Sequence, residues 1–451
     1  MTDILRVAIV GAGPAGFYTA DTLVREKGTG VHVELIDRLP TPYGLVRAGV
    51  APDHQHIKAV TRVFDKIAAS PSVCFHGGVT IGDDIDHATL AARHHAVVYA
   101  TGAPVPRPLG IPGEGLSGFH TAADVVPWYN GHPEHSDRHL EVSGERVVIV
   151  GNGNVALDIT RILASRIEAL RSTDIADHAV DVLSASRISE IVVVGRRGPA
   201  QAAFTRAELT ELAGMEDVDV IVPGAHDWMD EHLRAFGPAS DHPDAPLADL
   251  YRDLGGRRTE GRRIRVVLRF FAAPVEVVGE SAVEGITLAR TELRVRDDGT
   301  TFAVATDTTE TLATALVIAA TGYVARPIAT VPYEAGRGVF RHKQGRVSPG
   351  VYVAGWAKRG PSGVIGTNRK DAVETAQQLL EDFDAGLLVN PPGHTESFHD
   401  DLAADGGVVT DYQGWILIDE RERGLGVAQQ RPRVKLTSME HLLAVAGSTE
   451  Q

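Results

Sequence analysis

The chain has 451 residues, 43% of them hydrophobic and 23% charged, and its formal net charge is −15. This length exceeds what a single hydrophobic core usually holds, so we expect two domains or slightly more, and the acidic balance argues against nucleic acid as the main partner. The only cysteine, Cys74, excludes an intramolecular disulfide, a CxxC redox pair and a cysteine-ligated cluster within the chain, and we expect no metal site.

The start of the chain bears on where the protein works. Only a few residues precede the apolar run at 7–10, which leaves no room for a signal peptide. No apolar run approaches the roughly 18 residues that a membrane-spanning helix needs. We therefore expect a cytoplasmic enzyme with no membrane span.

The first predicted βαβ unit carries a nucleotide-binding pattern. The apolar strand runs into Gly11-x-Gly13-x-x-Gly16, a helix follows, and a second strand over 31–36 ends at Asp37. In this pattern the first glycine allows a tight turn, the second lets a pyrophosphate approach the backbone, and the third lets helix and strand pack closely. The helix N-terminus attracts the phosphates, and Asp37 can accept a hydrogen bond from a ribose hydroxyl. The pattern predicts a dinucleotide site.

A long proline- and glycine-rich loop over 39–54 follows, for which a functional and a plain surface interpretation are equally open. A helix is expected over 56–69. The apolar residues 96–99 then form a strand that runs into Ala100-Thr101-Gly102 and returns the chain to the sheet near the first site.

A second dinucleotide unit begins at residue 145. Residues 146–150 form a strand, and Gly151-x-Gly153-x-x-Ala156 opens a helix predicted over 156–170. A further helix over 174–186 precedes the strand 191–194.

That last strand ends in Gly195-Arg196-Arg197-Gly198 and has no acid there. Paired guanidinium groups fit a 2′-phosphate through charge-assisted bonds, whereas an acid would accept from a free 2′-hydroxyl. We therefore predict NADP at the second unit. Glu208, on the next helix, is a candidate to bind a ribose or to orient an arginine.

Two nucleotide sites in one chain are typical of a flavin–pyridine-nucleotide oxidoreductase, with FAD at the first and NADPH at the second. A second Ala-Thr-Gly turn, at 320–322, repeats the one at 100–102, and we interpret both turns as crossing points between domains. We predict an α/β protein with two Rossmann-like domains, in which an NADP domain, 104–321, is inserted into an FAD domain formed by 1–103 and 322–451.

Residues 350–368 contain a strand, a glycine-rich turn and the start of a helix expected from about Arg369 to Asp384. A helix N-terminus here would favour negative charge on the reduced flavin. Trp356 stands where many two-nucleotide flavoproteins have an aspartate, and we expect its ring beside the flavin. We draw no function from 225–260, and we expect two or three helices after residue 393, one of them capped by Thr437 or Ser438.

These motifs together resemble the adrenodoxin-reductase-type ferredoxin–NADP⁺ reductases, in particular the actinobacterial NADPH-ferredoxin reductases. The similarity covers essentially the whole chain. The matches are at 11–16, 41–54, 151–158, 195–203, 354–368 and 431–436. The resemblance implies a glutathione-reductase-like architecture and an activity in which NADPH passes hydride to FAD N5, and the flavin then releases single electrons to a ferredoxin-type iron–sulfur protein. A cytochrome P450 is one downstream enzyme that the family allows.

The resemblance also assigns residues. FAD contacts match Ala15, Asp37, Leu45, Val79, Trp356, Gly363, Val364 and Ile365, with Asp37 where family members commonly have Glu. NADP contacts match Asn152, Gly153, Asn154, Val155, Arg196, Arg197, Glu208 and Gly363. His54 and Asp158 match a pair described in the family as a hydrogen-bonded relay near the flavin, to which we assign a supportive role with protons or water.

The docking surface for an acidic ferredoxin is open at the level of sequence, since the enzyme is itself acidic. One candidate is an arginine-rich run, and the other is the pair Lys358 and Arg359. The arginine run consists of Arg257, Arg258, Arg262, Arg263, Arg265 and Arg269. A monomer is expected.

Other functions share parts of the pattern. A flavin monooxygenase or a stand-alone NADPH diaphorase has the same two sites, and a non-catalytic nucleotide sensor needs both sites without turnover. The electron-input subunits of larger complexes carry cysteine-ligated clusters ahead of the first unit, a segment not found here. A disulfide reductase is excluded because Cys74 stands alone.

Overall fold

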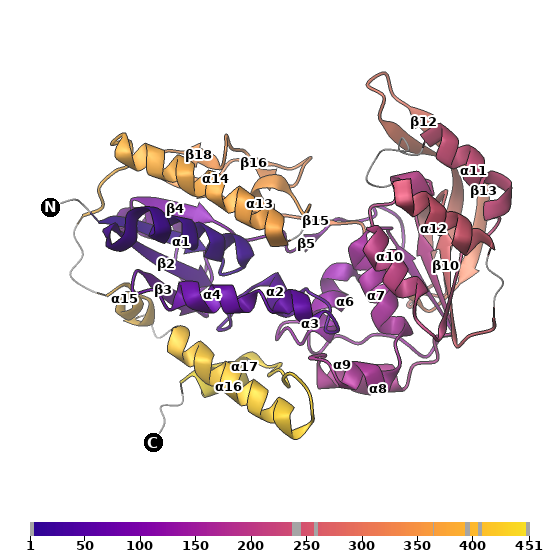
Figure 1. The fold of residues 1–451 in the computed structure, drawn as a ribbon, viewed down its shortest axis with the longest axis horizontal. Helices are drawn as coiled ribbons and strands as arrows, with labels where there is room; N and C mark the ends of the chain where they lie inside the picture. Colours follow the sequence, from indigo (N-terminus) through magenta and orange to yellow (C-terminus); the bar gives the residue numbers. More distant parts are fainter. Residues whose placement is uncertain are drawn as a thin grey trace.

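The computed structural model describes residues 4–236, 245–256, 260–363, 365–392, 397–404 and 408–447. Figure 1 shows two lobes side by side. One contains elements from both ends of the sequence, and the other contains the middle of the chain. Each lobe is built around a six-stranded sheet, which confirms the predicted α/β class with two Rossmann-like units.

The first sheet has the strand order β18-β19-β4-β1-β2-β3. Its strands are parallel except β18, which pairs antiparallel with β19. β-branched residues fill β1 and β2 because both faces of this sheet are covered. The strands are β1 (Leu5–Val10), β2 (Val31–Asp37), β3 (Val73–Gly77), β4 (Ala96–Tyr99), β18 (Arg346–Ser348) and β19 (Val351–Val353).

Helix α1 (Pro14–Lys27) packs against α14 (Ile365–Asp384) on one face of this sheet (Figure 1). The other elements of the lobe are mostly short, except α16. They are η1 (Gly28–Gly30), α2 (Leu45–Ala48), α3 (Gln55–Lys58), α4 (Thr61–Ala68), α5 (His87–Arg93), the hairpin β16 (Tyr333–Glu334) and β17 (Val339–Phe340), α13 (Trp356–Arg359), α15 (Phe398–Ala404), α16 (Tyr412–Ala428) and α17 (Met439–Ala446).

The second sheet has the order β6-β14-β7-β8-β10-β9, and all its pairings are parallel. Its strands are β6 (Phe119–Thr121), β7 (Arg146–Val150), β8 (Glu190–Val194), β9 (Val218–Ile221), β10 (Ile264–Arg269) and β14 (Leu316–Ala319). Strand β10 ends at Arg269, and Phe271 beyond it has a φ of 55°.

One face of this sheet is covered by helices and the other by a three-stranded antiparallel sheet that the sequence analysis did not predict. That sheet is β11 (Ala272–Val278), β12 (Gly285–Val295) and β13 (Thr301–Ala313). The remaining elements are α6 (Ala122–Tyr129), α7 (Asn154–Ala164), α8 (Ile167–Arg171), α9 (Asp177–Ser184), η2 (Pro199–Gln201), α10 (Arg206–Ala213), α11 (Ala225–Phe236) and α12 (Ala245–Gly256).

The chain crosses between the lobes twice, and the two crossings lie next to each other. β5 (Val105–Pro106) pairs antiparallel with β15 (Tyr323–Val324). The outward crossing follows β4 and the return follows β14, directly after the two Ala-Thr-Gly turns. The domain limits at 103 and 322 stay a prediction.

Two predicted helices are shorter than expected because the chain breaks them. The helix predicted over 56–69 is two helices, α3 and α4, and the one predicted over 156–170 ends at Ala164. There Ser165 is extended, and its hydroxyl donates to the carbonyl oxygen of Arg161 at 2.7 Å, which competes with helical hydrogen bonding.

Two further boundaries differ. The helix predicted over 174–186 covers only Asp177–Ser184, because Asp174 is instead a buried partner of two lysines. The helix expected from Arg369 begins at Ile365, so the glycine-rich turn before it is shorter than predicted. Ser438 is the N-cap of α17, as expected, and accepts from the backbone N–H of His441.

The C-terminal segment ties the lobes together through buried ion pairs. The Nζ atoms of Lys58, in the first lobe, and Lys435, in the tail, lie 2.7 and 3.1 Å from the carboxylate of Asp174 in the second lobe. Arg431 donates to the carbonyl oxygen of Thr173 at 3.0 Å. Burial alone would raise the pKa of Asp174, but the two lysines hold it well below its ordinary value.

Candidate nucleotide and redox sites

The first glycine turn has the shape that the sequence predicts. Gly11 has a φ of 109°, and a Cβ there would meet the carbonyl oxygen of Ala100 at 2.4 Å. A Cβ on Gly16 would meet the carbonyl oxygen of Gly11 at 2.0 Å. A Cβ on Gly13 would have only the Cα of Gly44 within reach, at 3.9 Å, so this glycine leaves open space at the N-terminus of α1. The space suits a phosphate group.

Asp37 holds this turn in place. Its carboxylate accepts from the backbone N–H of Ala12 at 2.8 Å and of Leu39 at 3.1 Å. Burial raises the pKa of Asp37, although these hydrogen bonds oppose the shift. The N–H of Val79 donates to the Asp37 carbonyl oxygen at 2.9 Å, so Val79 also lies beside this site. The sequence analysis assigned Asp37 to a ribose and missed that it orders the turn.

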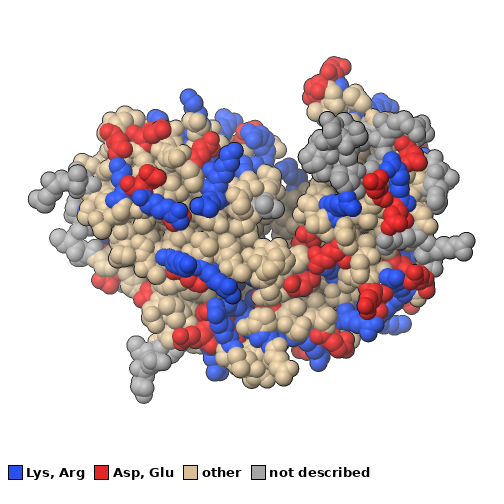
Figure 2. All heavy atoms as spheres, in the orientation of Figure 1, with Lys and Arg blue, Asp and Glu red and all other residues tan. Residues whose placement is uncertain are grey.

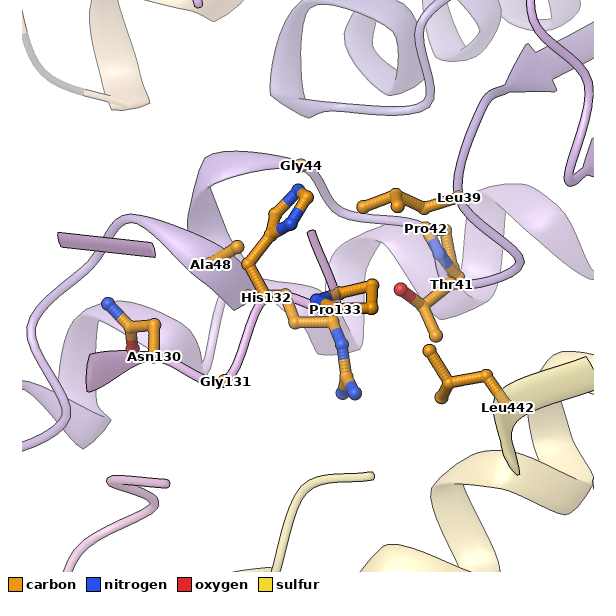
Figure 3. A pocket seen from close by; sticks show the side chains of 11 residues that line it. Leu39, Thr41, Pro42, Gly44, Ala48, Asn130, Gly131, His132, Pro133 and Leu442 are labelled. Atoms are coloured by element: carbon orange, nitrogen blue, oxygen red, sulfur yellow. The ribbon is translucent and has the colours of Figure 1, made fainter. Parts of the chain in front are cut away.

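The loop over 39–54 is mostly buried and lies on the glycine turn. The N–H of Tyr43 donates to the carbonyl oxygen of Ala12 at 2.8 Å. Leu45 is 46% exposed, in contrast to the buried Val46 beside it. A small pocket lies between this loop and the turn after α6, which carries His132 (Figure 3). Of the two interpretations, the plain surface loop is therefore wrong.

A second segment of the chain, from Gly355 to the start of α14, lies beside the first glycine turn. A Cβ on Gly355 would lie 2.6 Å from the Cβ of Ala15, so this turn packs on the first turn of α1. The ring of Trp356 stacks on Tyr323 with centroids 6.5 Å apart and an interplanar angle of 25°. Gly363 has a φ of 80° and lies two residues before Ile365, the first residue of α14.

Val364, a predicted FAD contact, lies outside the described residues. Two buried polar atoms near the first turn, the indole Nε1 of Trp356 and Oγ1 of Thr101, have no hydrogen-bond partner in the described part of the chain. Buried donors and acceptors are rarely left unpaired, so these atoms indicate a place for a polar ligand.

The second glycine turn repeats the first. Gly151 has a φ of 135°, and a Cβ there would meet the carbonyl oxygen of Ala320 at 2.2 Å. A Cβ on Gly153 would have only the Cβ of Ala203 nearby, at 4.0 Å.

Two predicted NADP contacts also support the local fold. Asn152 accepts with its carbonyl oxygen from the N–H of Ala203 at 2.9 Å. Asn154 accepts with its side chain from the N–H of Thr205 at 2.8 Å. Val155 is partly exposed in the first turn of α7. The backbone and outer faces of these residues therefore remain for a ligand.

Arg196 is exposed and Arg197 half-buried, just after β8. Neither guanidinium pairs with a carboxylate of any residue that the structure describes. Burial, together with the positive charge of Arg196, lowers the pKa of Arg197. Two adjacent cations without a protein counter-charge make a binding place for an anion such as a phosphate.

His54 and Asp158 meet where the lobes touch. His54 Nδ1 lies 3.9 Å from Asp158 Oδ1, beyond hydrogen-bond distance, while His54 Nε2 lies 3.2 Å from Glu211 Oε2. The pair is therefore close, but no direct hydrogen bond joins it. Burial raises the pKa of Asp158, against the opposing charges of Arg161 and His54.

Arg161 is the centre of this cluster and was not predicted. It is 3% exposed and bonds to Asp53 at 2.7 Å, to Asp158 at 2.8 Å and to Glu208 at 3.3 Å. Glu208 thus contacts an arginine, one of the two options the sequence left open. Asp53 comes from the first lobe and Arg161 from α7 of the second, so this cluster joins the two nucleotide units. The sequence gives no direct signal of this cluster, beyond the presence of Asp53 and His54 in the matched segment 41–54.

Tyr323 connects this cluster to Trp356. Its ring stacks on the indole, and burial, together with the charges of Asp124 and Asp158, raises the pKa of its hydroxyl. It directly follows the second Ala-Thr-Gly turn. Tyr323 therefore lies at the crossing, stacked on Trp356 and within electrostatic range of Asp158.

The cationic residues proposed from sequence for docking are mostly paired. Arg257 and Arg258 lie outside the described residues. The other arginines of that run bind carboxylates: Arg262 pairs with Glu260 and Asp219, Arg263 with Asp217, Arg265 with Glu190, and Arg269 with Glu310. Lys358 is buried against Asp371 and Glu374, and Arg359 lies 3.4 Å from Asp371. Their charges are therefore largely compensated.

Comparison with known proteins gives consistent matches. The family of pyridine nucleotide-disulphide oxidoreductases matches residues 5–197. NADPH-ferredoxin reductase FprA of Mycobacterium leprae is 41% identical over 452 residues, or 98% of each chain. The mitochondrial NADPH:adrenodoxin oxidoreductase of Arabidopsis thaliana is 36% identical over 463 residues, covering 98% of this chain and 96% of its own.

Among solved structures, Mycobacterium tuberculosis FprA in complex with NADPH is similar with a TM-score of 0.92 and 40% identity, over 98% of this chain and 99% of its own. Within the described ranges, no helix has the length and apolar character that crossing a membrane requires.

Proposed function

This chain belongs to the family of NADPH-ferredoxin reductases that includes FprA and adrenodoxin reductase, and it is a ferredoxin–NADP reductase; we propose that it holds FAD in the first unit and binds NADPH at the second. The observation that carries this proposal is the contrast between the two glycine turns. One is followed by an acid and covered by a buried loop, and the other is followed by two arginines that have no carboxylate partner among the described residues. When bound, FAD supplies a group that accepts a hydride from NADPH at N5 and gives up electrons singly.

The residues of the first unit fit FAD. Gly13 leaves room for the pyrophosphate at the N-terminus of α1, and Asp37 retains lone pairs for a ribose hydroxyl. The unpartnered Nε1 of Trp356 and Oγ1 of Thr101 would gain partners from a polar cofactor. Leu45, Val79 and the start of α14 would complete the contacts, with Val364 assigned from sequence alone.

The second unit fits a phosphorylated, exchangeable nucleotide. The N-terminus of α7 after Gly153 would receive the pyrophosphate. Arg196 and Arg197 would bind the 2′-phosphate and select NADPH over NADH. Among the described residues no buried loop covers this turn as residues 39–54 cover the first, and residues 151–155 are all partly exposed, so NADPH can enter and leave during each turnover. Hydride transfer needs only that the nicotinamide reach the flavin, so positioning is the main contribution of these side chains.

His54 and Asp158 are positioning residues in this proposal. Both touch the Arg161 cluster, which joins the lobes and fixes the angle at which the two units face each other. His54 can also accept or donate a proton at Nδ1 or Nε2, but hydride transfer requires no general acid or base. Their contribution is therefore supportive.

A ferredoxin needs a cationic surface close to the flavin, and the structure offers one that the sequence did not suggest. The cationic face consists of exposed residues on three packed helices: Arg25 on α1, Arg62 and Lys66 on α4, and Arg369 and Lys370 on α14. Of these, Arg25 pairs with Asp21. Figure 2 shows Lys and Arg side chains gathered over this part of the lobe.

The cationic face also adjoins the proposed flavin site, because α14 begins at Ile365, only one turn before Arg369. Complementary charge raises the rate of encounter and orients the partner. We therefore propose that the acidic iron–sulfur protein docks here, with the enzyme acting as a cytoplasmic monomer.

The test is reduction of cytochrome c by NADPH, with and without candidate ferredoxins from the same source. We expect a yellow protein whose flavin absorbance is bleached rapidly by NADPH and far more slowly by NADH, and cytochrome c reduction that depends on ferredoxin. Equal cytochrome c reduction without ferredoxin would indicate a diaphorase. Rapid uncoupled oxygen consumption would indicate a monooxygenase-like enzyme. A colourless protein that FAD cannot reconstitute would end the proposal.

The docking face is tested separately with Lys66→Glu and Lys370→Glu together. We expect the KM for ferredoxin to rise about tenfold, since each exposed charge pair contributes up to about 1 kcal/mol. NADPH-dependent reduction of ferricyanide, a small acceptor, should not change. Arg294→Glu, an exposed charge on β12 of the second lobe, is the matched control. Ferredoxin turnover should also fall as salt shortens the Debye length from about 10 Å at 0.1 M to about 3 Å at 1 M. Turnover that is insensitive to both changes would contradict this surface.

A further inference from the structure

Four side chains with metal-binding chemistry lie on one face of the first sheet, away from both glycine turns. His32 and Glu34 are on β2, and Cys74 and His76 are on β3. The strands are parallel, with Glu34 opposite Cys74 and Ile36 opposite His76. Alternate residues of a strand share a face, so the register places all four side chains together.

Three of these residues meet closely enough to hold one ion. One ligand atom each from His32, Glu34 and Cys74 lies within 4.8 Å of the others. His32 Nε2 is 2.8 Å from Glu34 Oε1. Zinc binds imidazole nitrogen and carboxylate oxygen at about 2.0–2.2 Å and thiolate sulfur at about 2.3 Å, so its tetrahedral ligands lie roughly 3–4 Å apart. The three residues supply nitrogen, oxygen and sulfur ligands within 4.8 Å of one another, so small side-chain movements would bring them to this spacing.

The surroundings support a built site. His76 is 3% exposed, and its Nε2 lies 2.5 Å from the second carboxylate oxygen of Glu34, which fixes the carboxylate. Its Nδ1 is buried without a hydrogen-bond partner in the described residues, and its ring packs edge-on against Phe398 at 5.2 Å. The side chain of His32 is 38% exposed, which gives an ion access from solvent. Carboxylate ligands held by a buried neighbour are typical of metal centres.

We propose that His32, Glu34 and Cys74 bind one zinc-class divalent ion, with water as the fourth ligand and His76 holding the carboxylate. Cys74 binds as the thiolate, and its proton passes to solvent. The ion would join β2 to the edge strand β3. His32 is the second residue of β2 and Asp37 is the last. At about 3.3 Å per residue the two lie about 16 Å apart, so the ion lies outside the proposed electron path.

The sequence analysis predicted no metal site, because no short sequence motif indicates this one. Glu34 and His76 are 42 residues apart, and only the pairing of β2 with β3 brings them together. Cys74 has no second cysteine near it in the sequence, so the spacing rules for zinc motifs find nothing.

The experiment uses the flavin-loaded enzyme after removal of metals with EDTA, and Zn²⁺ alone as the probe. Because Cys74 is the only cysteine, a thiol reagent reports on this residue and no other. We expect calorimetry to show one Zn²⁺ per chain. At a zinc concentration 100 times the dissociation constant, labelling of Cys74 should slow by roughly 100-fold, since only the unbound thiolate reacts.

Two variants locate the ligands. His32→Gln and Glu34→Gln should each abolish zinc protection of Cys74 while retaining flavin, and retention of flavin reports that the variant is folded. His139→Gln, an exposed histidine with 83% of its side chain accessible, should keep full protection. Zinc that leaves labelling of the unaltered enzyme unchanged would overturn the proposal, and so would variants that remain fully protected.

Discussion

The two dinucleotide units share one backbone design and differ in what surrounds it. In each, the first glycine has a φ above 100°, and a Cβ added there would meet the carbonyl oxygen of the alanine in an Ala-Thr-Gly turn, at 2.4 Å in the first unit and 2.2 Å in the second. In the first, Ala12, Ala15 and Gly16 are buried beneath a loop, whereas residues 151–155 of the second are all partly exposed.

The charges differ in the same direction. The first unit ends in a carboxylate whose oxygens already hold the turn, and the second ends in two guanidiniums without a counter-charge among the described residues. A covered site suits a cofactor that stays, and an open cationic site suits a phosphorylated substrate that exchanges. In the proposed assignment, retention and exchange are therefore decided by the surroundings of the turn and not by its glycines.

The largest expected effect comes from the glycines. Gly11→Ala and Gly151→Ala each force a side chain into a positive φ and onto a carbonyl oxygen. We expect Gly11→Ala to be isolated without flavin, and Gly151→Ala to keep flavin but lose at least about 100-fold in kcat/KM for NADPH, a loss of roughly 3 kcal/mol. Absorbance spectra and steady-state kinetics measure both.

Gly424→Ala is the matched control, because nothing lies within 4 Å of a Cβ at this exposed helical position. It should keep both flavin and activity. A yellow Gly11→Ala, or a Gly151→Ala with normal NADPH kinetics, would break the assignment of the two units.

The arginine pair should give the next largest effect. Arg196→Ala and Arg197→Ala each remove a charge-assisted contact worth about 1.5–3 kcal/mol, so KM for NADPH should rise about 10- to 100-fold for each. The kinetics with NADH should not change, because NADH lacks the 2′-phosphate. Arg421→Ala, an exposed arginine on α16, is the control. An equal rise in KM for NADH and NADPH would mean that these residues do not bind the 2′-phosphate.

The loop over 39–54, which covers the first glycine turn, is held by buried ion pairs. Arg47, in this loop, donates to the fully buried carboxylate of Glu422 at 2.8 Å, and Arg433 lies 3.1 Å from the same carboxylate. Glu422→Gln removes the carboxylate that pairs with Arg47 and leaves Arg433 with Asp419, 2.7 Å away, so it should destabilise the protein by about 3 kcal/mol. It should also speed loss of FAD without changing KM for NADPH. Denaturant unfolding and flavin release measure these effects, and Glu420→Gln, exposed on the same helix, is the control.

The same pair predicts a dependence on pH. Burial alone would raise the pKa of Glu422, but Arg47 and Arg433 hold it below its ordinary value. A lowered folded-state pKa contributes stability that is present above the unfolded value, about 4.3, and is lost as pH falls through the folded value. Glu422→Gln should remove this part of the acid sensitivity. An unchanged pH dependence of unfolding would show that other carboxylates account for it.

The smallest effect is expected at the contact between the units. His54→Gln should slow flavin reduction by NADPH by less than about tenfold, roughly 1 kcal/mol, because hydride transfer needs no acid or base. Flavin content and KM for NADPH should stay constant, since both units remain intact. Rapid mixing measures the rate, and His56→Gln, an exposed neighbour, is the control. A loss of 1,000-fold or more would make His54 an essential group.

Local patterns determined much of this protein. Gly11, Asp37, Gly151 and Arg196 are recognisable in sequence because strand, turn, helix and terminal residue are contiguous and each has one physical task. The same holds for the parallel sheets, whose buried strands read as apolar runs.

Only the tertiary structure decided which distant residues meet. Arg161 joins Asp53 to Asp158, and Lys435 joins Asp174, because the lobes and the tail pack together, which no spacing records. The paired arginines after residue 260 show the converse, since carboxylates from neighbouring strands, such as Asp219 and Glu190, compensate their charges. Contacts within one βαβ unit depend on local chain geometry, whereas contacts between units depend on burial and charge brought together by folding.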